Sequence, residues 1–179
     1  MSRRHVQIGL FAAALVGLAW AAFVVMGRDG EVSPSRLIGR PVPQVSLDRF
    51  DGSGAASLAE PGVVSVVNFW APWCVPCRRE HRDLGALRAS WDATQVRLVG
   101  VAFQSDLAAI GTFLDEIGEG VPTVIDDNGV AAIEFGVVGV PETFVIDRAG
   151  IVRRRFVGPI DPPELQRLID ELLLERPAA

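Results

Sequence analysis

Apolar residues follow two different periods along this chain, and the change of period predicts alternating strands and helices. A β-branched run covers residues 63–69, as expected of a central strand that is buried on both faces of a sheet. A second run of this kind covers 95–103. Between 75 and 91 apolar residues instead recur every three to four positions, which predicts a helix with one buried face.

The middle of the chain continues this alternation. A helix is expected to start after Ser105 or Asp106, either of which is placed to cap it, and to end near Gly118. Its predicted buried stripe has four members: Leu107, Ile110, Leu114 and Ile117. Residues 122–126 then predict a short strand, and residues 128–136 predict a short helix.

The last segments predict a hairpin followed by a helix. Two strand-like runs, "TFVID" and "IVRRRFVG", flank the turn "RAG". In the final helix, Asp161 and Glu164 have the spacing of a capping box, and Pro162 takes the first helical position. Its buried stripe is expected to contain Leu165, Leu168, Ile169, Leu172 and Leu173. This order of elements predicts an α/β fold with a mixed sheet and helices on both faces.

A long uncharged segment precedes these elements and predicts a membrane anchor. The apolar run 8–26 would span roughly 28 Å as a helix, close to the hydrocarbon thickness of a bilayer. Arg3 and Arg4 precede it, so the N-terminus is expected in the cytoplasm and the rest of the chain outside. The alternative is a cleaved signal peptide, because "AWA" at 19–21 fits a cleavage site.

The chain is therefore divided into three parts. Residues 1–27 form a cytoplasmic tail and transmembrane anchor, residues 28–36 a tether, and residues 37–176 one folded domain. The whole chain carries 22 acidic and 17 basic residues and a net charge of −5, so nucleic acid is not an expected partner.

The two cysteines, Cys74 and Cys77, lie between the first predicted strand and the helix that follows it. A zinc site would need two more donors, and the exported part offers only His81. Haem attachment requires a histidine directly after the second cysteine, where this chain has Arg78. A purely structural disulfide across two residues would contribute little stability. Redox exchange remains, with the first helical turn stabilising a thiolate at Cys74.

Longer motifs around the cysteines resemble a known family. "NFWAPWCVPC" followed by "GVPETFVID" resembles the thioredoxin superfamily. With the lead-in "LIGRPVPQVSL", the chain from about 37 to 174 resembles the membrane-anchored cytochrome c biogenesis thiol:disulfide interchange proteins of the CcmG/DsbE type. The resemblance implies a thioredoxin-like mixed sheet flanked by helices, and a redox-active disulfide as the working group without a cofactor or metal.

The same resemblance implies roles for individual residues. Cys74 would be the attacking thiol and Cys77 the resolving thiol. Pro141 would be a cis-proline lying against the disulfide, and it would leave the Val140 backbone free to pair with an extended substrate. Trp73 adjoins Cys74, where an exposed aromatic residue favours a docking surface, whereas Trp70 is expected in the core.

Two acidic residues are candidates for proton transfer. Glu142 follows the proline and is expected near the thiols, where its carboxylate would disfavour a thiolate and relay protons; the alternative is an exposed glutamate at a strand end. Glu80 resembles an acid of related reductases, but a solvated helix face explains it equally well. Asn68 stands where thioredoxin carries a buried aspartate, so the usual proton acceptor is missing.

These observations predict an extracytoplasmic protein thiol:disulfide oxidoreductase, single-pass in the cytoplasmic membrane with its C-terminal domain on the periplasmic side. It would act as a dithiol reductant that keeps the CxxCH cysteines of apocytochrome c, or a partner thiol protein, reduced. The resemblance implies a membrane electron donor of the DsbD/CcdA type. One alternative is a general reductase of the TlpA/ResA type, and the other is a non-catalytic copper- or haem-delivery chaperone.

Overall fold

The computed structural model describes residues 5, 17, 35–118 and 120–175. The chain divides into two compact units, and the second, Ser35–Ala179, contains the sheet and its helices. Among the described residues no helix is both long and apolar enough to cross a membrane. The predicted anchor at 8–26 lies outside them except for Gly17.

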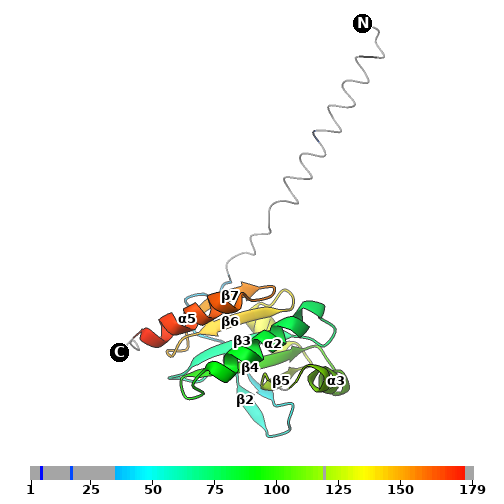
Figure 1. Ribbon diagram of the computed structural model, residues 1–179, viewed down its shortest axis with the longest axis horizontal. Coiled ribbons are helices and arrows are strands. Elements are labelled where there is room, and N and C mark those ends of the chain that lie inside the picture. The colour runs from blue at the N-terminus through cyan, green and yellow to red at the C-terminus, as the bar shows by residue number, and fades with distance from the viewer. Residues whose placement is uncertain (1–4, 6–16, 18–34, 119, 176–179) are drawn as a thin grey trace. The chain divides into compact units, whose positions relative to one another are not determined.

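A five-stranded mixed sheet forms the centre of the domain, as predicted (Figure 1). Its strands are β3 (Val64–Trp70), β4 (Val96–Phe103), β5 (Thr123–Asp126), β6 (Glu142–Ile146) and β7 (Val152–Val157). In the order β5-β4-β3-β6-β7, the first three strands are parallel, and β6 and β7 run antiparallel to their neighbours. Every residue of β3 is buried, which explains its unbroken apolar run.

Three helices pack on one face of this sheet: α2 (Val75–Ser90), α3 (Leu107–Ile117) and α5 (Pro162–Leu174). Leu84 of α2 and Leu165 of α5 are fully buried against Val66 of β3. Figure 1 shows α2 and α5 side by side in front of the strands. The predicted stripes on these two helices therefore explain how the first face is covered.

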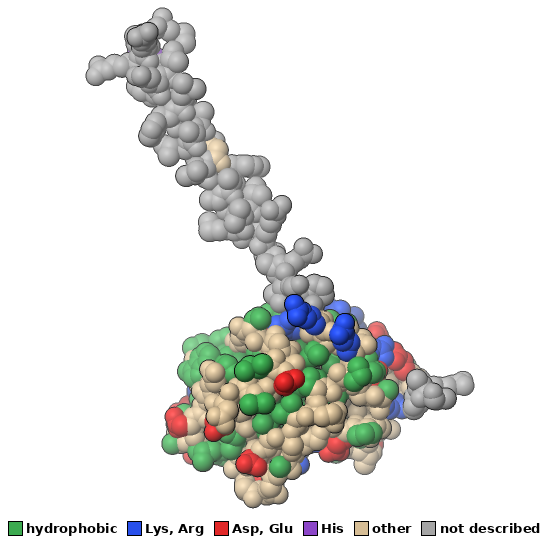
Figure 2. Space-filling view, turned by 180° about the vertical axis from the view of Figure 1, so that it is seen from behind, with side chains coloured by type: hydrophobic (Ala, Val, Ile, Leu, Met, Phe, Trp, Pro, Cys, Tyr) green, Lys and Arg blue, Asp and Glu red, His purple; other side chains and the backbone are tan. Residues whose placement is uncertain are grey.

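A hairpin and a short helix cover the opposite face. The hairpin consists of β1 (Ser46–Asp48) and β2 (Ala55–Ser57), and the helix is α4 (Val130–Phe135). Three rings from α4, β3 and β6 pack together with centroids 5.1 to 5.8 Å apart: Phe69, Phe135 and Phe144. The domain seen from behind in Figure 2 has much apolar surface, and most of its blue arginine side chains lie toward one edge.

The buried stripe of α3 differs from the prediction at one position. Leu107 is 59% exposed, while Phe113 is buried and takes its place beside Ile110 and Leu114. Leu107 is the first residue of α3, which begins just beyond the end of β4 at Phe103, so little of the sheet lies beneath it. The predicted cap is correct, because the Asp106 side chain accepts a hydrogen bond from the backbone N–H of Ala109.

The capping box predicted for the last helix does not form. Asp161 occupies the N-cap position, but its side chain makes no capping hydrogen bond. Pro162 and Pro163 occupy the first two helical positions and have no N–H, and the Asp161 side chain does not accept from the N–H of Glu164 at the third. Glu164 instead forms an ion pair with Arg154 of β7, 2.8 Å away.

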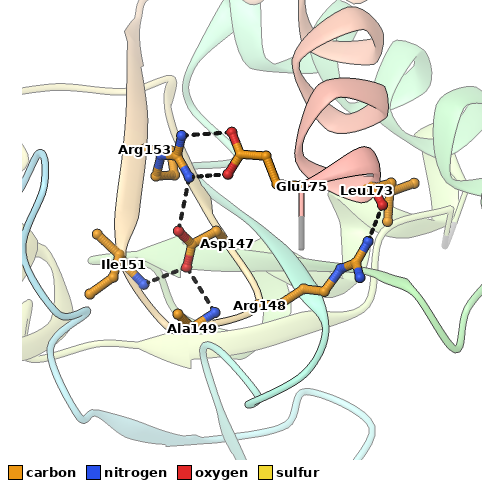
Figure 3. Close-up of polar contacts among 7 residues, drawn as sticks. All are labelled: Asp147, Arg148, Ala149, Ile151, Arg153, Leu173 and Glu175. Carbon is orange, nitrogen blue, oxygen red and sulfur yellow. Dashed lines mark hydrogen bonds and ion pairs between the residues drawn. The ribbon is translucent and has the colours of Figure 1, made fainter. Parts of the chain in front are cut away.

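The end of α5 is joined to the β6–β7 hairpin by polar contacts (Figure 3). Arg153 contacts both Asp147 in the turn and Glu175 at the end of the helix, at 3.1 and 2.6 Å. Asp147 also accepts hydrogen bonds from two backbone N–H groups of the turn. Arg148 donates to the backbone carbonyl of Leu173. These contacts fix the last turn of the helix against the hairpin.

Candidate active site

The cysteine pair lies at the junction between the end of β3 and the start of α2. Cys74 is the N-cap residue of α2, and Cys74 and Cys77 form a disulfide. The backbone N–H of Cys77 donates to the Cys74 Sγ at 3.2 Å. A helix N-terminus presents unpaired N–H groups and a partial positive charge, both of which stabilise a thiolate. The predicted start of the helix directly after Cys74 is confirmed.

The loop before β6 brings a distant part of the chain to this disulfide. The Val140–Pro141 peptide bond is cis. The Val140 carbonyl oxygen lies 3.6 Å from the Cys74 Sγ. The structure thus places the Val140 carbonyl beside the cysteine pair, and the implied roles of Val140 and Pro141 toward a substrate stay predictions.

Exposed apolar side chains occur at the site. Trp73 is 65% exposed, Val75 is 77% exposed, and Val138 in the loop before Pro141 is 74% exposed. Trp70 is fully buried, as predicted for a core residue. An exposed tryptophan beside a reactive cysteine is available for contact with a protein partner.

Glu80 lies on the buried face of α2, so the interpretation of this residue as part of a solvated helix face is wrong. Its side chain accepts hydrogen bonds from the Asn68 side-chain amide at 3.2 Å and from the backbone N–H of Ile160 at 3.0 Å. The same Asn68 amide also donates to the Thr143 hydroxyl at 2.9 Å. Burial raises the pKa of Glu80 to about 7, although these hydrogen bonds oppose the shift.

A cleft of about 570 Å³ opens beside this acid. Pro76, which lies between the two cysteines, and Glu80 both line it, together with Ile160 from the β7–α5 loop. Glu80 adjoins the cleft, although only 2% of the residue is exposed. A carboxyl group with a pKa near neutrality beside a cleft is suited to exchanging protons.

Glu142 is completely buried, so the alternative of an exposed glutamate at a strand end is wrong. Its carboxylate accepts hydrogen bonds from the Arg155 side chain and from the backbone N–H groups of Val138 and Gly139. Its neighbour Thr143 bonds Asn68 on the face covered by α2, and alternate strand residues point to opposite faces. Glu142 therefore points away from that face, and its predicted role as a proton relay stays a prediction.

Other charged and titratable residues near the cysteines have structural partners. Arg78 forms an ion pair with Glu116 of α3 and lies 5.4 Å from the Phe113 ring. His81 packs edge-on against Phe113 and against Trp70, with ring centroids 5.2 Å apart in each case. Burial lowers the pKa of His81 to about 4, and the Gly118 backbone opposes the shift.

Two groups at the site were not found from the sequence. Arg155 lies within three consecutive arginines, and a run of one charge at 153–155 hides the single member that points inward. The strand period of two does not single it out, because Arg153 and Val157, two positions away on either side, are both exposed. Ile160 acts through its backbone N–H, which leaves no signal in the sequence.

Comparison with known proteins agrees with this geometry. Residues 37–170 match the model of the Redoxin family. The thiol:disulfide interchange protein DsbE of Escherichia coli (strain K12) is 35% identical over 169 residues, which cover 90% of this chain and 89% of the relative. HelX of Rhodobacter capsulatus, also a thiol:disulfide interchange protein, is 33% identical over 167 residues, with 92% of each chain covered.

A solved structure described as a putative DsbE protein from Chlorobium tepidum has a TM-score of 0.70 and 29% identity, and the match covers 76% of this chain and 97% of the other. The chain belongs to the Redoxin family and, within the thioredoxin superfamily, is a thiol:disulfide oxidoreductase of the DsbE type, with Cys74–Cys77 as its redox-active disulfide.

Proposed function

We propose that this protein is a dithiol reductant in cytochrome c maturation. The observation that carries the proposal is the Cys74 sulfur at the N-terminus of α2, 3.6 Å from the Val140 carbonyl. This arrangement combines a stabilised thiolate with a backbone edge at which an extended polypeptide can lie. The similarity to interchange proteins over nine tenths of the chain supports the same class of reaction.

Reduction of a client proceeds in two exchanges. The Cys74 thiolate attacks a client disulfide, forms a mixed disulfide and releases one client thiolate, which takes up a proton. Cys77 then loses its proton, attacks Cys74 and releases the second client thiolate. The client gains two electrons and two protons, and the protein is left with the Cys74–Cys77 disulfide.

Glu80 is the proton acceptor in this scheme. It lies three residues after Cys77 on α2, so the two side chains project from the same side of the helix. With a pKa near 7, the carboxylate can take the Cys77 proton at neutral pH and release it through the adjoining cleft. Asn68 and Ile160 hold the carboxylate in place.

The client is an apocytochrome c with a CxxCH site, or the thiol protein that presents it. Haem attachment needs free thiols, whereas the space outside the cytoplasm oxidises such pairs. A reductant held at the outer face of the cytoplasmic membrane by the 8–26 segment would act where these sites emerge. Its electrons would come through a membrane thiol-transfer protein of the DsbD/CcdA type, because a reductant outside the cytoplasm must be recharged.

Two other functions would give different results in the same strains. Deletion of the gene should abolish holocytochrome c, an added small dithiol should restore it, and Cys74→Ala should fail to complement. Normal holocytochrome levels, with another thiol protein left oxidised, would instead identify a general reductase. One equivalent of copper or haem in the purified protein would favour the delivery chaperone.

A Cys77→Ala variant in membranes should retain the client as a mixed disulfide that mass spectrometry identifies.

A further inference from the structure

An ion pair between β6 and β7 lies directly beneath the loop that faces the disulfide. Arg155 donates to both carboxylate oxygens of Glu142, with both contacts at 2.9 Å. The two side chains are 6% and 1% exposed. A buried pair that forms two parallel hydrogen bonds is strong and fixed in direction, and loss of either partner leaves a buried charge alone.

The same pair binds the backbone of the loop 136–140. The Glu142 Oε1 accepts hydrogen bonds from the N–H groups of Val138 at 3.0 Å and Gly139 at 3.2 Å. Arg155 also donates to the Gly136 carbonyl at 3.4 Å. Three backbone groups within four residues are therefore held by two buried side chains.

This loop carries the groups that a protein substrate would meet. Its last residue is Val140, whose carbonyl lies 3.6 Å from the Cys74 Sγ. The Val138 N–H points inward to Glu142, and the Val138 side chain is left 74% exposed. The inward hydrogen bonds thus hold the loop with an apolar side chain outward and the Val140 carbonyl at the sulfur.

We propose that Arg155 is a positioning residue for substrate binding: with Glu142 it holds the loop 136–140 in the shape that receives an extended polypeptide containing a disulfide. The substrate backbone lies along Val140, and an apolar substrate side chain contacts Val138. The inference depends on the thiol:disulfide exchange activity alone and not on the nature of the client. It assigns Glu142 to loop structure, because its charge is balanced by Arg155 and both its oxygens are occupied.

The test compares a peptide substrate with a small disulfide. The peptide contains an oxidised Cys-x-x-Cys pair flanked by valine and leucine, and the small reagent is 5,5′-dithiobis(2-nitrobenzoic acid), which is too small to span the loop. In Arg155→Met, we expect KM for the peptide to rise about tenfold, while the rate with the small reagent stays within about twofold. Arg154→Met is the matched control, because Arg154 is the neighbouring residue and pairs with Glu164 at the surface; it should change neither value.

Two further variants keep the test decisive if Arg155→Met does not fold. Val138→Ser alters an exposed side chain and should raise KM for the peptide without changing the rate with the small reagent. Glu142→Gln should likewise raise KM for the peptide and leave the rate with the small reagent unchanged. The pH profile of its reaction should coincide with that of the parent. An unchanged KM in Val138→Ser, equal slowing of both substrates, or a displaced pH profile in Glu142→Gln would each overturn the proposal.

The design also separates this inference from the proposed function. Two peptides are used, one with histidine directly after the second cysteine and one with serine there. Equal reduction of the two would count against a haem-related client, yet the comparison of Arg155→Met with the parent would hold for either peptide.

Discussion

Asn68 and Glu80 are joined by a hydrogen bond of 3.2 Å between the side-chain amide of β3 and the carboxyl group of α2. Thioredoxin, which this chain resembles, carries a buried aspartate on the strand at the position of Asn68. Here the strand supplies a neutral amide, and the acid reaches the same buried region from the helix. The site therefore has one buried carboxyl group beneath α2, and its position is set by a strand residue.

We expect Glu80→Gln to slow reduction of a protein disulfide at pH 7 by about tenfold or more, because the Cys77 proton then has no nearby acceptor. The deficit should shrink at higher pH, where hydroxide removes that proton. Stopped-flow measurement of exchange against pH checks this. Glu134→Gln, which changes an exposed acid of α4 on the opposite face of the sheet, is the control. A deficit that stays constant with pH would contradict the role of proton acceptor.

The pKa of about 7 for Glu80 also predicts how stability depends on pH. The native carboxyl group holds its proton more tightly than the unfolded one, whose pKa is 4.5. This contribution to stability is therefore fully present below pH 4.5 and is lost as pH rises to about 7. The loss is of order 3 kcal/mol. Glu80→Gln should remove it, so denaturant unfolding of the oxidised protein at pH 8 should show the variant to be more stable than the parent.

His81 should contribute in the opposite direction. Its pKa is lowered from 6.5 to about 4, so between these pH values the imidazole is protonated in the unfolded state and neutral in the native state. Its contribution is present above pH 6.5 and is lost as pH falls toward 4. His81→Phe should therefore be more acid-resistant than the parent, because a phenyl ring fits between Trp70 and Phe113 without charging. Equal stability of the two at pH 4.5 would show that His81 is not held neutral.

Packing on the face covered by α5 should be tested by a matched pair of truncations in that helix. Leu165 is fully buried, whereas Leu174 is 86% exposed. Leu165→Ala should lower the free energy of unfolding by about 2 to 5 kcal/mol through lost burial and the cavity left behind. Leu174→Ala should change it by less than about 0.5 kcal/mol. Urea unfolding followed by tryptophan fluorescence gives both values, and similar losses would mean that α5 does not pack on the sheet through Leu165.

Reduced Cys74 should react with iodoacetamide at a lower pH than a free cysteine does, because the first turn of α2 stabilises its thiolate. The measurement uses Cys77→Ser, so that only one thiol is present. A rate profile that coincides with that of a free cysteine would show that the helix N-terminus has no influence. Glu142→Gln should leave this profile unchanged, because Arg155 already balances the carboxylate.

Local motifs made the cysteine site predictable from the sequence. Cys74, Cys77 and Pro141 are recognised by the residues beside them, and the periods of β3 and α2 place the pair at the junction of strand and helix. The order of strands and helices followed from the same periods. A short motif carries its geometry with it, so these features did not depend on distant contacts.

The roles of the two acids depended on tertiary contacts and were harder to predict. Whether Glu80 is solvated or buried is decided by the loop that follows β7, eighty residues further along the chain. Whether Glu142 stands as a lone charge or half of an ion pair is decided by Arg155 on the adjacent strand. No periodicity within the helix or the strand reports on either contact.

The hydrogen bond from Ile160 to Glu80 makes the proposed proton acceptor depend on a loop that follows the cysteines by more than eighty residues. A polypeptide made from its N-terminus carries both cysteines well before residue 160 is available to fold. A nascent chain can therefore expose a cysteine pair whose acid is not yet enclosed. Full competence in exchange should therefore arise only after the loop between β7 and α5 has folded against Glu80.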